Sequence, residues 1–301
     1  MNTPPSSTFF SVSPDWGWLV TLYFFVGGLA GGSYFLAVML DLFGRVEDRP
    51  LARLGYYISF PCIVLSGILL TLDLHRPLRF WHMLIESNTF QPMFKPWSPM
   101  SIGSWALTIF GLFSLIKFLS ALAEEGRLNW PQAQRWRPPH PIGTVVSIIG
   151  GLLAFFVAGY TGVLLAVTNR PIWSDSPLLG MLFVISAASI SASLMLLLAQ
   201  RSRWTTPGVS ALHRLDGWVV ALELIVLVVF LVSLGPVFRA LLSAWGVLLV
   251  LGVIVLGMLM PLALFWRRDL LGERNIAGIA LLVLIGGFLL RLIIVFSAQG
   301  V

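Results

Sequence analysis

An acid, an imidazole and a guanidinium lie within four positions of one another, at Asp73, His75 and Arg76. They directly follow an apolar run, so we expect them at the surface of whatever buries that run. A histidine changes its charge near neutral pH, so this group could exchange protons during a redox reaction. A structural interpretation is equally open, in which Asp73 pairs with Arg76 to fix the turn.

Two carboxylic residues, Asp216 and Glu223, lie inside a long apolar run. Their spacing of seven places them on one helix face, about 10 Å apart along the axis. Neither has a basic residue beside it, and an unpaired carboxyl group in an apolar medium tends to be neutral. The two could relay protons, or each could be a neutral side chain bonded to a neighbouring helix. Ser186, Ser189 and Ser193 share a face of the preceding run, where they either pack or hold water beside the carboxyl groups.

The elements that position these residues are expected to be transmembrane helices. The 301 residues are 57% hydrophobic and only 11% charged, whereas soluble proteins average about 25% charged residues. About 20 apolar residues cross the hydrocarbon core as a helix, and continuous runs exclude the alternation of a barrel strand. We therefore predict an all-α integral membrane protein. Its eight expected runs are 17–43, 53–72, 99–122, 143–168, 177–199, 212–234, 242–265 and 275–297, and the break between the sixth and seventh is the shortest.

Basic residues are distributed unevenly between the two sets of connections. Of the 19 Lys and Arg residues, 13 lie in or next to the connections that follow the first, third, fifth and seventh runs. The positive-inside rule therefore predicts that both termini, including the tail 1–16, are extracytoplasmic. The long connection 73–98 lies on the same outer side. It is rich in Trp, Phe and Pro, which suits a docking surface, and Trp81, His82 and Trp97 are its candidate partner contacts.

Two further polar residues lie toward the outer ends of their runs. Arg291 is within about two turns of the end of the last run, so snorkelling to the interface explains it. Tyr160 lies at a similar depth in the fourth run. A tyrosine there is often part of the interfacial aromatic belt, but Gly159 and Gly162 leave room for a flat ligand.

Small residues cluster in the first run, where Gly28 and Gly32 form a GxxxG pair. Such a pair lets two helices approach closely. Tight packing within the chain is the main interpretation, and a homodimer face or a close ligand approach is the alternative.

No set of metal ligands is apparent. Cys62 is the only cysteine, which excludes an internal disulfide and a cysteine-ligated cluster. The four histidines, at 75, 82, 140 and 213, lie at run ends or in connections, so neither a bis-histidine haem nor a zinc site is predicted. If the protein handles electrons, an exchangeable lipid-soluble carrier must bring them, and another subunit must hold the next carrier.

Several segments together resemble the NrfD/polysulfide-reductase membrane subunits of molybdopterin and related respiratory complexes. The resemblance spans most of the chain and implies one membrane domain, 1–301, made of two four-helix bundles in the bacterial cytoplasmic (inner) membrane. The matching segments are Gly27–Gly32, Leu72–Pro77 with Phe80-Trp81, Ser101–Trp105, Tyr160–Trp173 and Leu212–Asp216.

The resemblance also implies a cofactor and partners. It implies menaquinone or ubiquinone near the outer surface, beside a ferredoxin-like iron–sulfur subunit, with a molybdopterin catalytic subunit beyond. Tyr160 matches the tyrosine that the family places at the quinone. Asp73, His75 and Arg76 match an interface motif, and a quinone role for them is our inference. Some members have a histidine near the outer end of the first helix, where this chain has none.

The resulting hypothesis is a membrane anchor that passes electrons between quinone and an extracytoplasmic iron–sulfur subunit. Proton translocation through Glu223, Asp216 and Ser189 is an added hypothesis. The alternatives are a secondary transporter or proton channel with no redox role, and a passive anchor with the quinone bound elsewhere.

Overall fold

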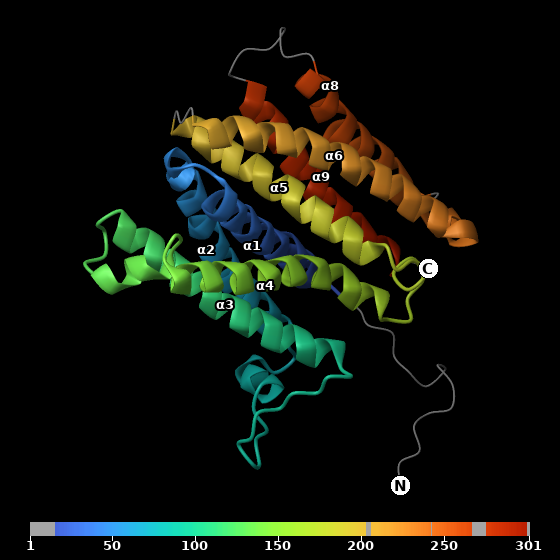
Figure 1. The fold of residues 1–301 in the computed structure, drawn as a ribbon. Coiled ribbons are helices and arrows are strands. Elements are labelled where there is room, and N and C mark those ends of the chain that lie inside the picture. The colour runs from blue at the N-terminus through green and yellow to red at the C-terminus, as the bar shows by residue number, and fades with distance from the viewer. Residues whose placement is uncertain (1–15, 203–205, 242, 267–274, 300–301) are drawn as a thin grey trace.

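The chain folds into eight long apolar helices, each long enough to cross a membrane. The computed structural model describes residues 16–202, 206–241, 243–266 and 275–299 (Figure 1). The all-α prediction with eight spans is confirmed. The spans are α1 (Trp18–Phe43), α2 (Arg49–Asp73), α3 (Pro99–Glu124), α4 (Pro141–Ala166), α5 (Leu179–Arg201), α6 (Pro207–Ser233), a seventh made of α7 (Ala244–Leu248), η6 (Leu249–Leu259) and α8 (Met260–Trp266), and α9 (Asn275–Ser297).

The observed helices begin and end close to the predicted runs. The largest difference is at the start of α6, which begins at Pro207 where residue 212 was expected. Hydropathy detects only the part of a helix that lies in hydrocarbon, so helices extend beyond the predicted runs into the polar interface. The short break after α6 is present as the 3-10 segment η5 (Gly235–Leu241), where Gly235 has a φ of 52°. Of the tail 1–16, only Trp16 lies within the described residues.

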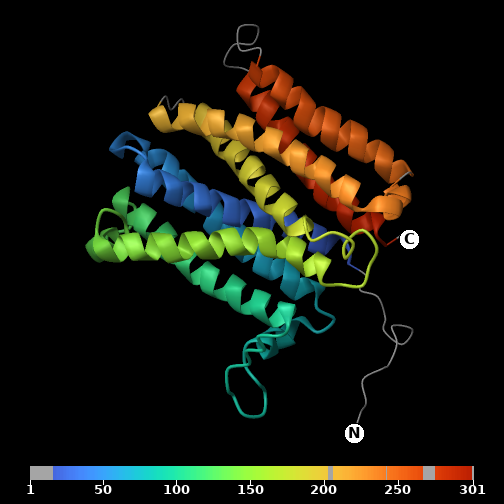
Figure 2. The same cartoon turned by 45° about the vertical axis from the view of Figure 1, so that its right-hand side comes forward.

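The helices form two bundles of four, as the resemblance implied. Helices α1 to α4 pack together in one bundle, and α5, α6, the seventh span and α9 form the other. Figures 1 and 2 show α1 and α5 side by side at the junction between the two bundles. The seventh span is continuous, and its middle part, η6, is π-helical.

The glycines of α1 allow this junction to be tight. A side chain on Gly31 would collide with the Ala154 carbonyl of α4, and one on Gly32 would collide with the Ala187 carbonyl of α5. Since lipid tails are as apolar as leucine, close contact of this kind is a main source of helix association in a membrane. The predicted packing role of the small residues within the chain is confirmed for Gly32.

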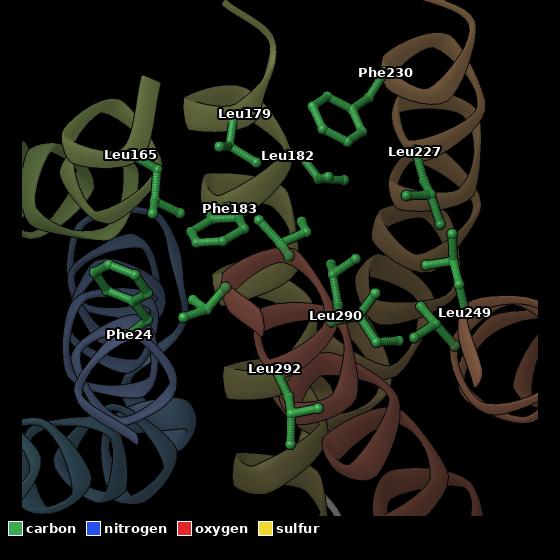
Figure 3. Packing of buried hydrophobic residues seen from close by; sticks show 14 of the residues in the cluster. Phe24, Leu165, Leu179, Leu182, Phe183, Leu227, Phe230, Leu249, Leu290 and Leu292 are labelled. Carbon is green, nitrogen blue, oxygen red and sulfur yellow. The ribbon is translucent and has the colours of Figure 1, made fainter. Parts of the chain in front are cut away.

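Apolar side chains fill the space between α1, α5, α6 and α9. Figure 3 shows Phe24, Phe183, Leu227 and Leu290 pointing toward one another from these four helices. They belong to a large cluster of buried residues that extends through the second bundle into the junction. This packing holds rigid the helices that carry the buried polar groups described below.

We name the two ends of the helical domain after one residue at each end. The Tyr160 end holds the start of α1, the end of α9 and the connections 74–98 and 167–178. The Arg137 end holds the connections 44–48 and 125–140, with the short 3-10 segments η2 (Val46–Asp48) and η4 (Pro131–Trp136).

Candidate functional site

Tyr160 is buried in the first bundle, near the end of α4. Its hydroxyl donates a hydrogen bond of 2.5 Å to the carbonyl oxygen of Pro99, the first residue of α3. The ring stacks on Phe156 with 5.8 Å between centroids. A side chain on Gly103 would collide with the ring. Tyr160 is therefore held between α3 and α4, and Gly103 provides its space.

Tyr23 is a neighbour of Tyr160 that the sequence analysis did not assign to the site. It projects from the first turns of α1, is 2% exposed, and interacts electrostatically with Tyr160. It belongs to the region where some family members have a histidine. In this chain that region therefore provides a second phenol beside Tyr160. The only sequence signal for this role is the position of Tyr23 near the start of the first apolar run.

Asp73, His75 and Arg76 lie at the Tyr160 end, where α2 gives way to the connection 74–98. All three are exposed. Asp73 is close enough to His75 to feel its charge. In the part of the chain that the structure describes, Asp73 and Arg76 form no ion pair, and none of the three side chains makes a hydrogen bond. The predicted turn-fixing ion pair is therefore not formed, and these polar groups are available to a ligand.

The structure places Tyr160 and this exposed trio at the same end of the bundle but not in direct contact. Within the described residues, no hydrogen bond, ion pair or ring contact joins them. The connection 74–98 links them, because it follows Asp73 directly and leads to Pro99. Tyr160 donates its hydrogen bond to the carbonyl oxygen of Pro99.

The connection 74–98 is folded. It contains the 3-10 segment η3 (Pro77–Met83) and an antiparallel bridge between Ile85 and Pro92. The indole of Trp105 in α3 donates a hydrogen bond of 2.9 Å to the Met93 carbonyl and fastens the segment to the bundle. Figure 1 shows it projecting beyond the ends of α2 and α3. The segment is therefore ordered and not a linker, and its role as a docking surface stays a prediction.

Large apolar side chains of this connection are exposed. Trp97 is 79% exposed, whereas Trp81 and His82 are half-buried and in mutual edge-to-face contact at 4.0 Å. Of the three predicted docking residues, Trp97 is thus the most accessible. The other exposed apolar side chains of the segment are Leu78, Phe80, Ile85, Phe90 and Phe94.

Glu223 lies near the middle of α6 and is 3% exposed, inside the second bundle. Its carboxyl group lies near the hydroxyls of Ser186 and Ser189 on α5 and near the charge of Arg291 on α9. The Ser189 hydroxyl has no hydrogen-bond partner among the described residues. The Ser186 hydroxyl also accepts a hydrogen bond of 3.0 Å from Arg291 Nη1. Ser186 therefore lies between the acid and the base. Of the two interpretations of these serines, packing or holding water beside the carboxyl groups, the position of Ser186 is compatible with the second.

Two expectations for Arg291 and Glu223 are wrong. Arg291 does not snorkel, because it is fully buried and donates hydrogen bonds to the carbonyls of Phe24, at 3.1 Å, and Gly287, at 2.7 Å. Glu223 does have a basic partner, which comes from the last helix of the chain. Gly28 makes this possible, since a side chain there would come within 3.0 Å of the guanidinium.

Asp216 lies two turns away from Glu223 on α6, toward the Arg137 end. It is 1% exposed, and Ser193 of α5 donates a hydrogen bond of 2.8 Å to its Oδ2. Ser189 lies between Ser186 and Ser193 on α5 and is fully buried. Three hydroxyl groups and two carboxyl groups thus line the contact between α5 and α6, over about 10 Å.

The family model for "Polysulphide reductase, NrfD" matches residues 7–301. The chain belongs to this family. It is 28% identical to protein NrfD of Escherichia coli, over 98% of both proteins, and 29% identical to a polysulfide reductase chain of Wolinella succinogenes, over 94% of both. It is also 26% identical to a selenate reductase subunit of Mesobacillus selenatarsenatis, over 34% of this chain and 22% of that protein. The resemblance drawn from the sequence motifs is confirmed, and the protein is a multi-pass membrane protein.

This NrfD-family chain has a second buried charge cluster, at the Arg137 end, that sequence reasoning missed. Asp41 of α1 accepts hydrogen bonds from Arg137, at 2.5 and 3.1 Å, and from the Tyr56 hydroxyl, at 2.7 Å. Lys117 of α3 is fully buried, 3.9 Å from Asp41 and 2.5 Å from the Ser147 hydroxyl. The signal available was the presence of Asp41 and Lys117 inside predicted runs.

Histidine, cysteine and carboxylate side chains do not gather into a group of three or more that could hold a metal ion, within the residues described. His75 and His82 lie at the Tyr160 end, and His140 and His213 belong to the opposite half of the bundle.

Proposed function

We propose that this chain is the quinone-interacting membrane subunit of a bacterial respiratory reductase complex. In this proposal it passes electrons between membrane quinone, either menaquinone or ubiquinone, and a ferredoxin-like iron–sulfur subunit, with a molybdopterin catalytic subunit beyond. Two of its relatives are named as parts of polysulfide and selenate reductases. The observation that carries the proposal is that Tyr160, the exposed Asp73–His75 pair and the exposed aromatic connection share one end of the bundle.

The distribution of basic residues supports an orientation for this end. Among the described residues, the Arg137 half carries nine of the 15 Lys and Arg side chains, and the Tyr160 half carries six, of which Arg291 is buried inside the bundle. By the positive-inside rule the Tyr160 end faces outward from the cytoplasmic membrane. The connection 74–98 then meets extracytoplasmic partner subunits, with Trp97, Trp81 and His82 as proposed contacts.

The side chains at this end fit a quinone headgroup, which is a flat apolar ring with two carbonyl acceptors. When bound, it supplies a mobile carrier of two electrons and two protons. His75 can donate a hydrogen bond to a carbonyl, and Asp73 can orient the imidazole and exchange protons with water. Tyr160 can donate as well if its hydroxyl turns away from Pro99. Arg76 adds positive charge that favours the more electron-rich form of the ring.

Binding of a hydroxyquinoline N-oxide quinone analogue, followed by fluorescence quenching, tests the site. His75→Ala and Tyr160→Phe each remove one hydrogen-bond donor, so each should weaken binding by about tenfold. His140→Ala, at the opposite end of the bundle, is the matched control and should leave binding unchanged. Unaltered affinity in both site variants would place the quinone elsewhere and favour the passive anchor.

We further propose that Glu223, Asp216 and Ser189 carry protons through the second bundle. The support is the row of buried hydroxyl and carboxyl groups between α5 and α6, from Ser186 to Asp216. Polar groups inside a membrane are costly and are typical of such routes.

Glu223→Gln in the complex, reconstituted in vesicles, tests this route, and Glu47→Gln in the exposed segment η2 is its control. We expect the complex with Glu223→Gln to keep its quinone turnover and to translocate fewer protons than the unaltered complex. If the variant changes neither quantity, the route is wrong. Proton movement that continues without any quinone turnover in the unaltered protein would instead favour a proton channel with no redox role.

A further inference from the structure

A cavity of about 630 Å³ opens at the Arg137 end of the first bundle. Its walls come from the start of α2, the last turns of α3, the segment η4 and the residues 137–140 that precede α4. The residues that give it its chemistry are Arg49, Ser120, Glu124, Arg135, Arg137 and His140. None of them belongs to the proposed quinone site or proton route.

The charges in this cavity are unbalanced. Glu124 is the only carboxylate of its lining, and it forms an ion pair with Arg137, which Asp41 binds as well. The other two arginines of the lining are Arg49 and Arg135. Neither side chain has an ion pair or a hydrogen bond within the part of the chain that the structure describes. The cavity therefore carries two uncompensated positive charges.

Backbone and imidazole groups add to this anion preference. His140 Nδ1 is buried and has no hydrogen-bond partner among the described residues. His140 is also the N-cap of the 26-residue helix α4, and its side chain does not cap the helix. The positive end of a long helix dipole thus adjoins the cavity. Arginines, an unpaired imidazole and a helix N-terminus together suit a phosphate group.

An apolar stripe on α4 begins two residues beyond His140. Ile142, Val145, Ile149 and Leu152 are spaced by three or four residues on one face of the helix, and they are between 43% and 67% exposed. A soluble anion would make no use of such a surface. A phospholipid would use both parts, with its phosphate in the basic cavity and its acyl chains along the stripe.

We infer that this cavity binds the phosphate headgroup of an anionic phospholipid from the leaflet at the Arg137 end. The lipid bridges the start of α2, through Arg49, and the segment η4, through Arg135. It thereby closes this end of the first bundle over the buried Asp41–Lys117 cluster. Anionic lipids are typical ligands of basic pockets at the cytoplasmic ends of membrane helices.

Thermal unfolding of the purified full chain in a neutral detergent tests the inference. The additions are phosphatidylglycerol, phosphatidylcholine or inorganic phosphate. Phosphatidylglycerol should raise the melting temperature in a saturable manner, and the other two should not. Equal shifts from the two lipids would overturn the proposal, and a full shift from inorganic phosphate would show that the ligand is a free anion.

Two variants complete the test. Both arginines lie outside the packed core, so Arg49→Gln combined with Arg135→Gln should keep the fold and weaken phosphatidylglycerol binding by at least about tenfold. Arg79→Gln combined with Lys95→Gln removes the same charge at the opposite end and should leave the lipid effect intact. Native mass spectrometry of retained lipid gives a second readout. Full retention of phosphatidylglycerol by the Arg49/Arg135 variant would contradict the assignment, whatever its melting temperature.

Discussion

Arg291 and Glu223 act on each other across the second bundle, although they lie 68 positions apart on different helices and form no direct ion pair among the described contacts. The Ser186 hydroxyl lies between them, because it accepts a hydrogen bond from Arg291 Nη1 at 3.0 Å and interacts with the Glu223 carboxyl group. A serine can do both, since a hydroxyl is donor and acceptor at once. The arrangement keeps a buried acid and a buried base close, with a hydroxyl between them.

The first prediction concerns this coupling. Arg291→Gln should destabilise the protein by about 1–3 kcal/mol, because it removes buried hydrogen bonds to Phe24, Gly287 and Ser186. It also removes the positive charge near the Glu223 carboxylate. Glu223→Gln removes that carboxylate, so the double variant should be more stable than the sum of the two single changes predicts, by about 0.5–3 kcal/mol. Unfolding of the four proteins in detergent measures this coupling. Additivity within about 0.5 kcal/mol would show that the two residues do not interact.

The second prediction uses two glycines of α3. A side chain at position 103 collides with the Tyr160 ring, whereas one at position 111 meets nothing within 4 Å. Gly103→Ala should therefore displace Tyr160, break its hydrogen bond to Pro99 and weaken binding of the quinone analogue. Gly111→Ala makes the same chemical change in the same helix and should leave binding unaltered. If both variants bind alike, Tyr160 is not part of the site.

The positions of the helices could be predicted from the sequence, but the contacts between helices could not. A run such as 99–122 is identified from hydropathy alone, because a helix must satisfy its own backbone in lipid. The serines of α5 were predicted to share one face because helical spacing fixes which residues do so. Arg291 could not be placed in this way. Its direction depends on the space left by Gly28, far away in the first helix, and on an acid in α6, neither of which is visible in the local sequence.

The third prediction concerns the exposed connection. Trp97 is 79% exposed and has no ring partner among the described residues. Trp97→Ala should leave the melting temperature of the isolated subunit nearly unchanged and reduce binding of the partner subunits by about 2 kcal/mol or more, as is typical of an aromatic interface residue. Trp218→Ala is the control, since Trp218 is 77% exposed on α6, a membrane-spanning helix. Co-purification and titration of the partners measure the difference. Equal loss in the two variants would point to a general effect on the membrane domain.

The fourth prediction concerns the buried cluster at the Arg137 end. Asp41 is the one carboxylate, among the described residues, that contacts Arg137, Tyr56 and Lys117 together. Asp41→Asn keeps the size of the side chain but leaves two buried cations without that negative charge, so it should destabilise the protein by about 3–5 kcal/mol. Glu47→Gln removes an exposed carboxylate nearby and should change stability by less than about 0.5 kcal/mol. Thermal unfolding of the two variants measures the difference.

A double variant identifies the source of this cost. Because Lys117 lies fully inside the bundle, Lys117→Met in the Asp41→Asn background should recover part of the loss, since it removes the buried cation that pairs with Asp41. If the double variant is no more stable than Asp41→Asn alone, the cost arises from the lost Arg137 and Tyr56 hydrogen bonds and not from the buried lysine.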